Sequence, residues 1–157
     1  MSKAKEAVIL LVEDDANDIL LFRRALAAVM PEASLIVAAN AEEAQAYLLR
    51  PDPRVLECLA LVLLDLKLPG RSGMELLGWI RTRKALRQVV VVALTSSREA
   101  NDLRLAYDLG VNSHLVKPTG YEALSAAVKS LCGYWINLNE RAPSRAPDNN
   151  RTVQESA

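Results

Sequence analysis

Short apolar runs alternate with segments of helical periodicity along most of the chain. The apolar runs are rich in branched residues and too short to be buried helices, so each predicts a strand. The five predicted strands cover residues 7–12, 34–38, 59–64, 89–94 and 111–116. The segments between and after them carry apolar residues at helical spacing, which predicts helices over residues 15–30, 41–49, 74–83, 97–109 and 121–131.

This alternation predicts the α/β fold class. Strands that are apolar on both faces are typical of a parallel sheet with helices on both sides. Right-handed crossovers then favour a doubly wound five-stranded parallel sheet with strand order 2-1-3-4-5, the flavodoxin-like arrangement. In that order the chain reverses direction between the first and third strands, and ligands bind in the crevice at their carboxyl ends.

Polar side chains with complementary chemistry follow four of the predicted strands. Glu13 and Asp14 follow the first strand, Asp65 the third, Thr95 the fourth and Lys117 the fifth. Any one of them can simply be a polar residue that leaves an apolar strand. Their joint occurrence at one edge of the sheet predicts a site.

The residue types at this edge suit phosphoryl transfer. Clustered carboxylates repel one another unless a cation neutralises them, and oxygen ligands of this kind suit Mg²⁺. A carboxylate can act as a nucleophile and form an aspartyl phosphate, and Asp65 lies at the centre of the crevice. We expect Lys117 to neutralise the phosphoryl oxygens from one side and Thr95 to donate a hydrogen bond to one of them.

The stretches around these residues resemble the signature blocks of bacterial response-regulator receiver domains. The blocks are LVEDD at 11–15, VLLDLKLPG at 62–70, ALTSS at 93–97 and VKP at 116–118. The resemblance covers about residues 7–132, which we expect to form the receiver domain. It implies that the chain works as a switch that is phosphorylated by a histidine kinase.

The resemblance also assigns roles to individual residues. Asp65 is the phosphoacceptor, and the implied metal ligands are the side chains of Glu13, Asp14 and Asp65 and the main-chain carbonyl of Lys67. Thr95 and Lys117 match the hydroxyl and lysine positions of the family, and a cis peptide bond is implied before Pro118.

One position departs from the family pattern. An aromatic residue usually stands three residues before the lysine and turns inward when the hydroxyl engages the phosphate, but this chain has His114 there. Either His114 is a half-buried surface residue, or its imidazole takes over the switch between two rotamers, with a charge that adds pH sensitivity.

Softer motifs narrow the resemblance. Residues 107–113 and 133–139 are similar to single-domain regulators that partner bacterial phytochrome histidine kinases. This subgroup implies a phytochrome kinase as partner and favours a homodimer formed through helix 97–109, strand 111–116 and helix 121–131. That same face is expected to change on phosphorylation.

The chain ends carry weaker signals. Residues 133–140 are expected to form an extension in which Tyr134 and Trp135 cover either the domain itself or a dimer partner. Residues 1–6 and 141–157 lack apolar periodicity and are expected to be disordered.

Composition excludes several classes of protein. The 157 residues contain 19 basic and 19 acidic side chains, so the uniform basic surface of a nucleic-acid-binding protein is missing. The chain has no apolar run of the roughly 18 residues that a membrane span needs, which favours a cytoplasmic protein. The two cysteines, Cys58 and Cys132, are far apart in apolar surroundings and are expected to be free thiols.

Two other functions compete with the receiver hypothesis. A phosphatase of the haloacid-dehalogenase type also uses an aspartyl nucleophile and Mg²⁺. Enzymes of that type share a second Asp two residues after the nucleophile, and this chain has Lys67 at that position. We therefore do not expect an enzyme. A pseudo-receiver that is never phosphorylated is the second alternative, and the complete set of acidic, hydroxyl and lysine residues argues against it.

Overall fold

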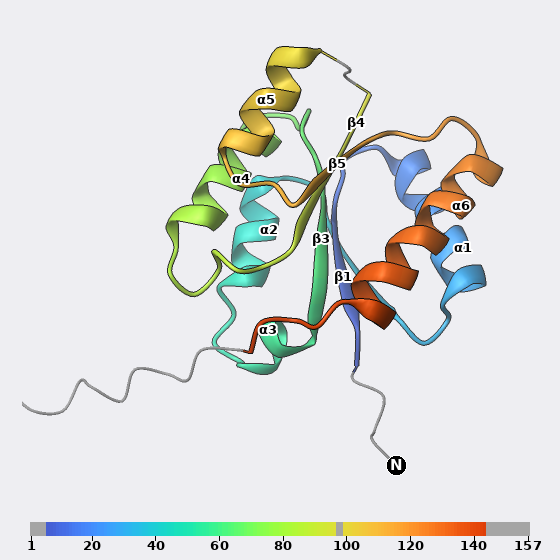
Figure 1. Ribbon diagram of the computed structural model, residues 1–157, viewed down its shortest axis with the longest axis horizontal. Helices are drawn as coiled ribbons and strands as arrows, with labels where there is room; N and C mark the ends of the chain where they lie inside the picture. Colours follow the sequence, from blue (N-terminus) through green and yellow to red (C-terminus); the bar gives the residue numbers. More distant parts are fainter. Residues whose placement is uncertain (1–5, 97–98, 144–157) are drawn as a thin grey trace, which may run out of the picture.

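The computed structural model describes residues 6–96 and 99–143 and contains one parallel sheet of five strands (Figure 1). Its order is β2-β1-β3-β4-β5, which confirms the predicted doubly wound topology. The strands are β1 (Val8–Val12), β2 (Ser34–Ala38), β3 (Leu59–Asp65), β4 (Val91–Thr95) and β5 (Ser113–Val116).

Helices cover both faces of the sheet. They are α1 (Ala16–Val29), α2 (Ala41–Leu48), α3 (Arg54–Cys58), α4 (Gly73–Thr82), α5 (Ala100–Asp108), α6 (Tyr121–Cys132) and the π-helical segment η1 (Gly133–Leu138). Figure 1 shows α1 and α6 on one side of the sheet and α2, α4 and α5 on the other. The sequence did not predict α3, because a helix of five residues is too short to show a periodic pattern.

Local signals fix where the helices begin and end. Asp15 caps α1 by accepting a hydrogen bond from Asp18 N–H, and Asn40 caps α2 by accepting one from Glu43 N–H at 2.8 Å. Gly110 follows the C-cap of α5 with a φ of 96°, a conformation that glycine adopts without strain. This glycine turns the chain from α5 into β5.

The sheet separates two hydrophobic cores. Leu10 and Leu64 belong to the core beneath α2, α4 and α5, while Leu11 and Leu63 belong to the core beneath α1 and α6. All four side chains are almost fully buried. The central strands are therefore apolar on both faces, as a helix-covered parallel sheet requires, and polar residues on them lie at their ends.

Arg81 is half-buried, unlike the exposed basic residues that follow it on the loop after α4. Arg81 ties α4 to the loop that precedes β4 and to the loop that precedes β5. Its guanidinium donates to the carbonyls of Gly110 at 2.7 Å, Arg87 at 3.0 Å and Val89 at 2.6 Å, and to Asn112 Oδ1 at 2.8 Å. Burial lowers the pKa of Arg81.

The C-terminal segment continues α6 beneath the sheet. Trp135 and Ile136 pack against the core of α1 and α6, whereas Tyr134 is exposed and meets the Trp135 ring edge-on at 4.7 Å between centroids. Arg141 then donates to the carbonyl of Glu57 at 3.0 Å. Apart from Glu6 and residues 141–143, the termini predicted to be disordered lie outside the described residues.

Both cysteines are free. Burial raises the pKa of Cys132 to about 11, which makes its thiol unreactive at neutral pH. Within residues 6–96 and 99–143, no helix is long and apolar enough to cross a membrane.

Candidate functional site

The carboxyl ends of β1 and β3 bring three carboxylates together. Glu13 follows β1 directly and Asp65 is the last residue of β3, and both are buried, with 4% and 6% of their surface exposed. Asp14 is exposed beside them. One oxygen from each of the three carboxylates lies within 4.8 Å of the other two. The predicted acidic cluster is present at the predicted edge of the sheet.

Lys117 inserts its ammonium group into this cluster. Its Nζ lies 2.7 Å from Glu13 Oε2, 3.0 Å from Asp65 Oδ2 and 3.0 Å from Asp18 Oδ2. An ammonium group has three donors, so the three carboxylates match its full capacity. Burial would lower the pKa of Lys117, but the hydrogen bonds to Glu13, Asp65 and Asp18 outweigh it and raise that pKa above its ordinary value.

The charge balance differs for Glu13. Burial penalises its ionised form and raises its pKa, and the nearby charge of Asp65 acts in the same direction. The hydrogen bonds from Lys117 and from Asp15 N–H, which lies 3.0 Å from Glu13 Oε1, oppose this shift without cancelling it. A second cation beside Glu13 would therefore stabilise the ionised form of its carboxyl group.

The chain after β3 holds Asp65 in place. Lys67 N–H donates to Asp65 Oδ1 at 2.9 Å, and Gly73 N–H donates to the carbonyl of Leu66 at 3.1 Å. A Cβ at position 73 would collide with the carbonyl oxygen of Asp65 and come within 2.7 Å of Leu66 Cα, so only glycine fits there. The role of the Lys67 carbonyl as a metal ligand stays a prediction.

Thr95 and His114 lie on the two strands at the other side of Asp65. Thr95 is buried at the end of β4, and its carbonyl accepts the Lys117 N–H at 2.9 Å. His114 pairs with Ala93 in the β4–β5 register, two residues before Thr95. Its Nε2 is buried, and the part of the chain that the structure describes offers it no hydrogen-bond partner.

The peptide bond between Lys117 and Pro118 is trans, so the expected cis bond is wrong. Trans is the ordinary state even before proline, where the cis form costs about 0.5–1 kcal/mol.

Asp18 is the site residue that sequence reasoning missed. It lies in the first turn of α1, three residues after the N-cap Asp15, and reaches Lys117 from across the sheet edge. An acidic residue in a first helical turn is ordinarily read as a response to the helix dipole, so its spacing gave no signal of a second role.

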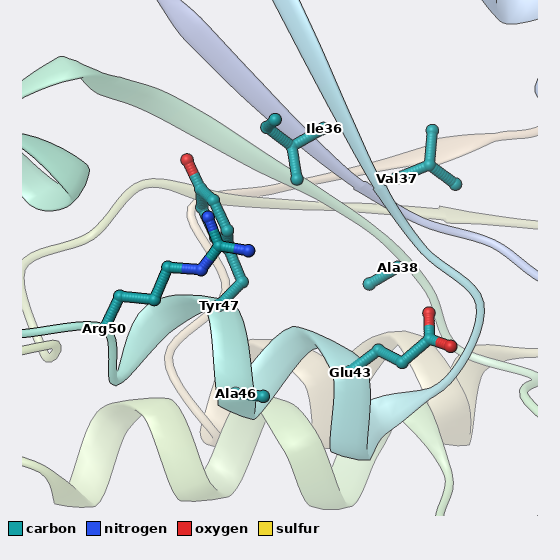
Figure 2. A pocket seen from close by; sticks show the side chains of 7 residues that line it. All are labelled: Ile36, Val37, Ala38, Glu43, Ala46, Tyr47 and Arg50. Carbon is teal, nitrogen blue, oxygen red and sulfur yellow. The ribbon is translucent and has the colours of Figure 1, made fainter.

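The described part of the chain also has an open pocket of about 310 Å³, which is lined by other residues than the acidic cluster (Figure 2). It lies between the edge strand β2 and α2, where the Arg50 guanidinium stacks over the Tyr47 ring at 5.0 Å. Its lining residues are Ile36, Val37, Ala38, Glu43, Ala46, Tyr47 and Arg50. None of the predicted site residues lines it, so the candidate chemistry resides in the acidic cluster.

The cluster suits a hard divalent cation. Its donors are all carboxylate oxygens, two buried and one exposed, and an exposed ligand leaves room for water on the metal. Magnesium is octahedral and retains several waters, so three carboxylate oxygens would leave its remaining positions to water, and the donor set fits this ion.

Comparisons with known proteins agree with this geometry. The family model described as the response regulator receiver domain matches residues 9–129. The probable methanogenesis regulatory protein FilR2 of Methanothrix harundinacea is 36% identical over 139 residues, which cover 88% of this chain and 89% of FilR2. The response regulator Rcp1 of Synechocystis sp. is 32% identical over 136 residues, which cover 82% of this chain and 88% of Rcp1.

Two solved structures are similar over nearly their whole length. The phosphorylated cyanobacterial phytochrome response regulator RcpA matches with a TM-score of 0.79 and 31% identity, covering 88% of this chain and 99% of RcpA. The Mn²⁺-bound form of Rcp1 matches with a TM-score of 0.76 and 30% identity, covering 87% of this chain and 99% of that structure. With the strand order and the acidic cluster, these matches establish that the chain belongs to the family of response regulator receiver domains.

Proposed function

We propose that this receiver domain accepts a phosphoryl group on Asp65 from a histidine kinase, with Mg²⁺ bound beside it. The observation that carries the proposal is the position of the Asp65 carboxylate, buried at the end of the central strand between Glu13 and the Lys117 ammonium. The family is one of signalling domains and not of classical enzymes, so phosphorylation changes binding and not turnover.

The residues supply the parts of the transfer. A carboxylate oxygen of Asp65 attacks phosphorus, and the bond from phosphorus to the kinase histidine breaks. Mg²⁺ bound by Glu13, Asp14, Asp65 and the Lys67 carbonyl would neutralise phosphoryl oxygens on one side. Lys117, now 3.0 Å from Asp65 Oδ2, is placed to pair with another phosphoryl oxygen.

We propose that Thr95 and His114 change conformation in response to the phosphoryl group. Thr95 lies at the end of the strand next to β3, where its hydroxyl can turn toward a phosphoryl oxygen. The His114 side chain, with its unpartnered buried Nε2, then changes rotamer. The imidazole NMR signals of His114 should shift on phosphorylation of wild type and stay in place in Thr95→Ala.

The face of α5, β5 and α6 is the proposed output surface and homodimer contact. Large apolar side chains are exposed on these three elements, an arrangement that favours association. They are Leu103, Leu105, Tyr107, Val116 and Tyr121. Phosphorylation should raise the dimer fraction measured by light scattering, and Tyr107→Arg should abolish that rise.

The proposed kinase is a bacterial phytochrome. The similarity to the phytochrome response regulator RcpA over 88% of the chain supports this partner. The experiment is phosphotransfer from purified, autophosphorylated kinases to this chain. A phytochrome kinase should transfer within seconds to wild type and not to Asp65→Asn, while a kinase unrelated to phytochromes should be much slower. Equal rates from both kinases would contradict the partner but not the phosphoacceptor.

A further inference from the structure

Asp18 is the third carboxylate at the Lys117 ammonium, and it differs from the other two. Glu13 and Asp65 belong both to the contacts of Lys117 and to the acidic cluster, whereas Asp18 contacts Lys117 but is outside the group whose oxygens lie within 4.8 Å of one another. Asp18 can therefore pair with the ammonium without using an oxygen that a metal would need.

The fold holds Asp18 at this position. Its N–H donates to Asp15 Oδ1 at 2.9 Å, which fixes it in the first turn of α1. The positive end of the α1 dipole favours a carboxylate there. Its side chain is 47% exposed, compared with 26% for Lys117, so the pair lies at the mouth of the site and not in the core.

Lys117 and a divalent cation compete for the same oxygens. The ammonium is bound to Glu13 Oε2 and Asp65 Oδ2, and a cation in the cluster draws on those two carboxylates. When the cation binds, Lys117 must give up part of those contacts and needs another anion close by. Asp18 Oδ2, at 3.0 Å, already occupies that position.

We propose that Asp18 is a positioning residue that holds the Lys117 ammonium beside Asp65 when a divalent cation takes over Glu13 and Asp65. The proposal rests on the proposed function, because it requires Mg²⁺ at this cluster. It adds that the affinity for Mg²⁺ depends on whether the displaced Lys117 ammonium has another anion to pair with. Asp18 thereby lowers the cost of metal binding and keeps the lysine within reach of the acceptor carboxylate.

The test is the Mg²⁺ dissociation constant, measured by following backbone amide NMR signals near Asp14 and Lys67. Asp18→Asn should weaken Mg²⁺ binding about two- to fivefold, the scale of a partly exposed ion pair. The matched control is Glu122→Gln, which removes one acidic charge from the first turn of α6. It should leave the constant unchanged.

Repeating the comparison in the Lys117→Met variant distinguishes a positioning role of Asp18 from a general effect of its negative charge on the metal. In Lys117→Met, which removes the competing ammonium, Asp18→Asn should have no more effect than Glu122→Gln. An equal loss of affinity with and without Lys117 would overturn the proposal, as would an unchanged constant in Asp18→Asn. The ¹⁵N signal of Lys117 Nζ in the metal-free protein gives a test that holds even if Lys117→Met does not fold. Asp18→Asn should shift this signal, and no shift would overturn the proposal.

Failure of the proposed function has a different signature. Wild type without saturable Mg²⁺ binding would contradict the metal site itself and this inference with it. Wild type that binds Mg²⁺ equally well with Asn at position 18 would contradict only the role of Asp18.

Discussion

Lys117 Nζ lies 2.7 Å from Glu13 Oε2, so the protein's own cation neutralises one of the carboxylates proposed to hold Mg²⁺. The carboxylate oxygens of Glu13, Asp14 and Asp65 lie within 4.8 Å of one another, and carboxylates this close cannot all stay ionised without a positive partner. The lysine thus preserves the cluster in its metal-free form. It also sets the competition that any metal must overcome, which links metal affinity, pH and stability at one site.

The raised pKa of Glu13 predicts a pH-dependent stability. Because the folded state favours the protonated form, the contribution of Glu13 to stability is complete below its ordinary pKa of 4.5 and is lost as the pH rises through the raised value. Glu13→Gln mimics the protonated form. Without metal, it should therefore be more stable than wild type at pH 7, with the difference vanishing below pH 4.5.

Urea unfolding at the two pH values measures this effect. The control is Glu42→Gln in the exposed first turn of α2, which should change stability little at either pH. Adding Mg²⁺ at pH 7 should stabilise wild type more than Glu13→Gln. A variant less stable than wild type at pH 7 without metal would show that the Lys117 contact outweighs burial at Glu13.

Gly73 should be irreplaceable in the chain after β3. An added Cβ meets the carbonyl of Asp65 and Leu66 Cα, so Gly73→Ala should destabilise the protein by about 1–3 kcal/mol and weaken Mg²⁺ binding by shifting Asp65. Gly78→Ala in the same helix is the matched control, because its Cβ would have ordinary contact with Leu109 Cδ2 at 3.8 Å. It should stabilise by about 0.5–1 kcal/mol.

Denaturant titrations of the two alanine variants provide the comparison. Similar free energies of unfolding in Gly73→Ala and Gly78→Ala would contradict the close approach of α4 to the end of β3.

Arg81 should contribute more to stability than Arg83, the exposed basic residue that follows α4. Arg81→Met removes the donors to three carbonyls and to Asn112, and we expect a loss of about 2–4 kcal/mol. Arg83 stacks over the Trp79 ring at 4.9 Å and is exposed, so Arg83→Met should cost about 0.5–1 kcal/mol. Equal costs, measured by thermal or urea unfolding, would refute the bridging role.

The sequence predicted the sheet order and the clustering of Glu13, Asp14 and Asp65 because both follow from repeating patterns. Apolar strands specify a covered parallel sheet, and that sheet brings the residues after its strands to one edge. The contacts of Asp18 and Arg81 escaped prediction for a common reason. Each is a charged residue on a helix, where exposure is the ordinary expectation, and each finds its partners across long stretches of sequence.

Helix boundaries show the same limit. The five-residue α3 is too short to show a periodic pattern, and apolar spacing does not distinguish the π-helical form of the continuation through Gly133 from an ordinary helix.

The intact mass of the protein after incubation with acetyl phosphate tests the central claim most directly. The experiment compares wild type with and without Mg²⁺ and includes Asp65→Asn, a near-isosteric variant that keeps the fold but lacks the nucleophilic carboxylate. We predict a single phosphoryl increment in wild type that depends on Mg²⁺ and is absent in Asp65→Asn. No increment under any condition, or an increment that persists in Asp65→Asn, would contradict the assignment of Asp65 as the phosphoacceptor.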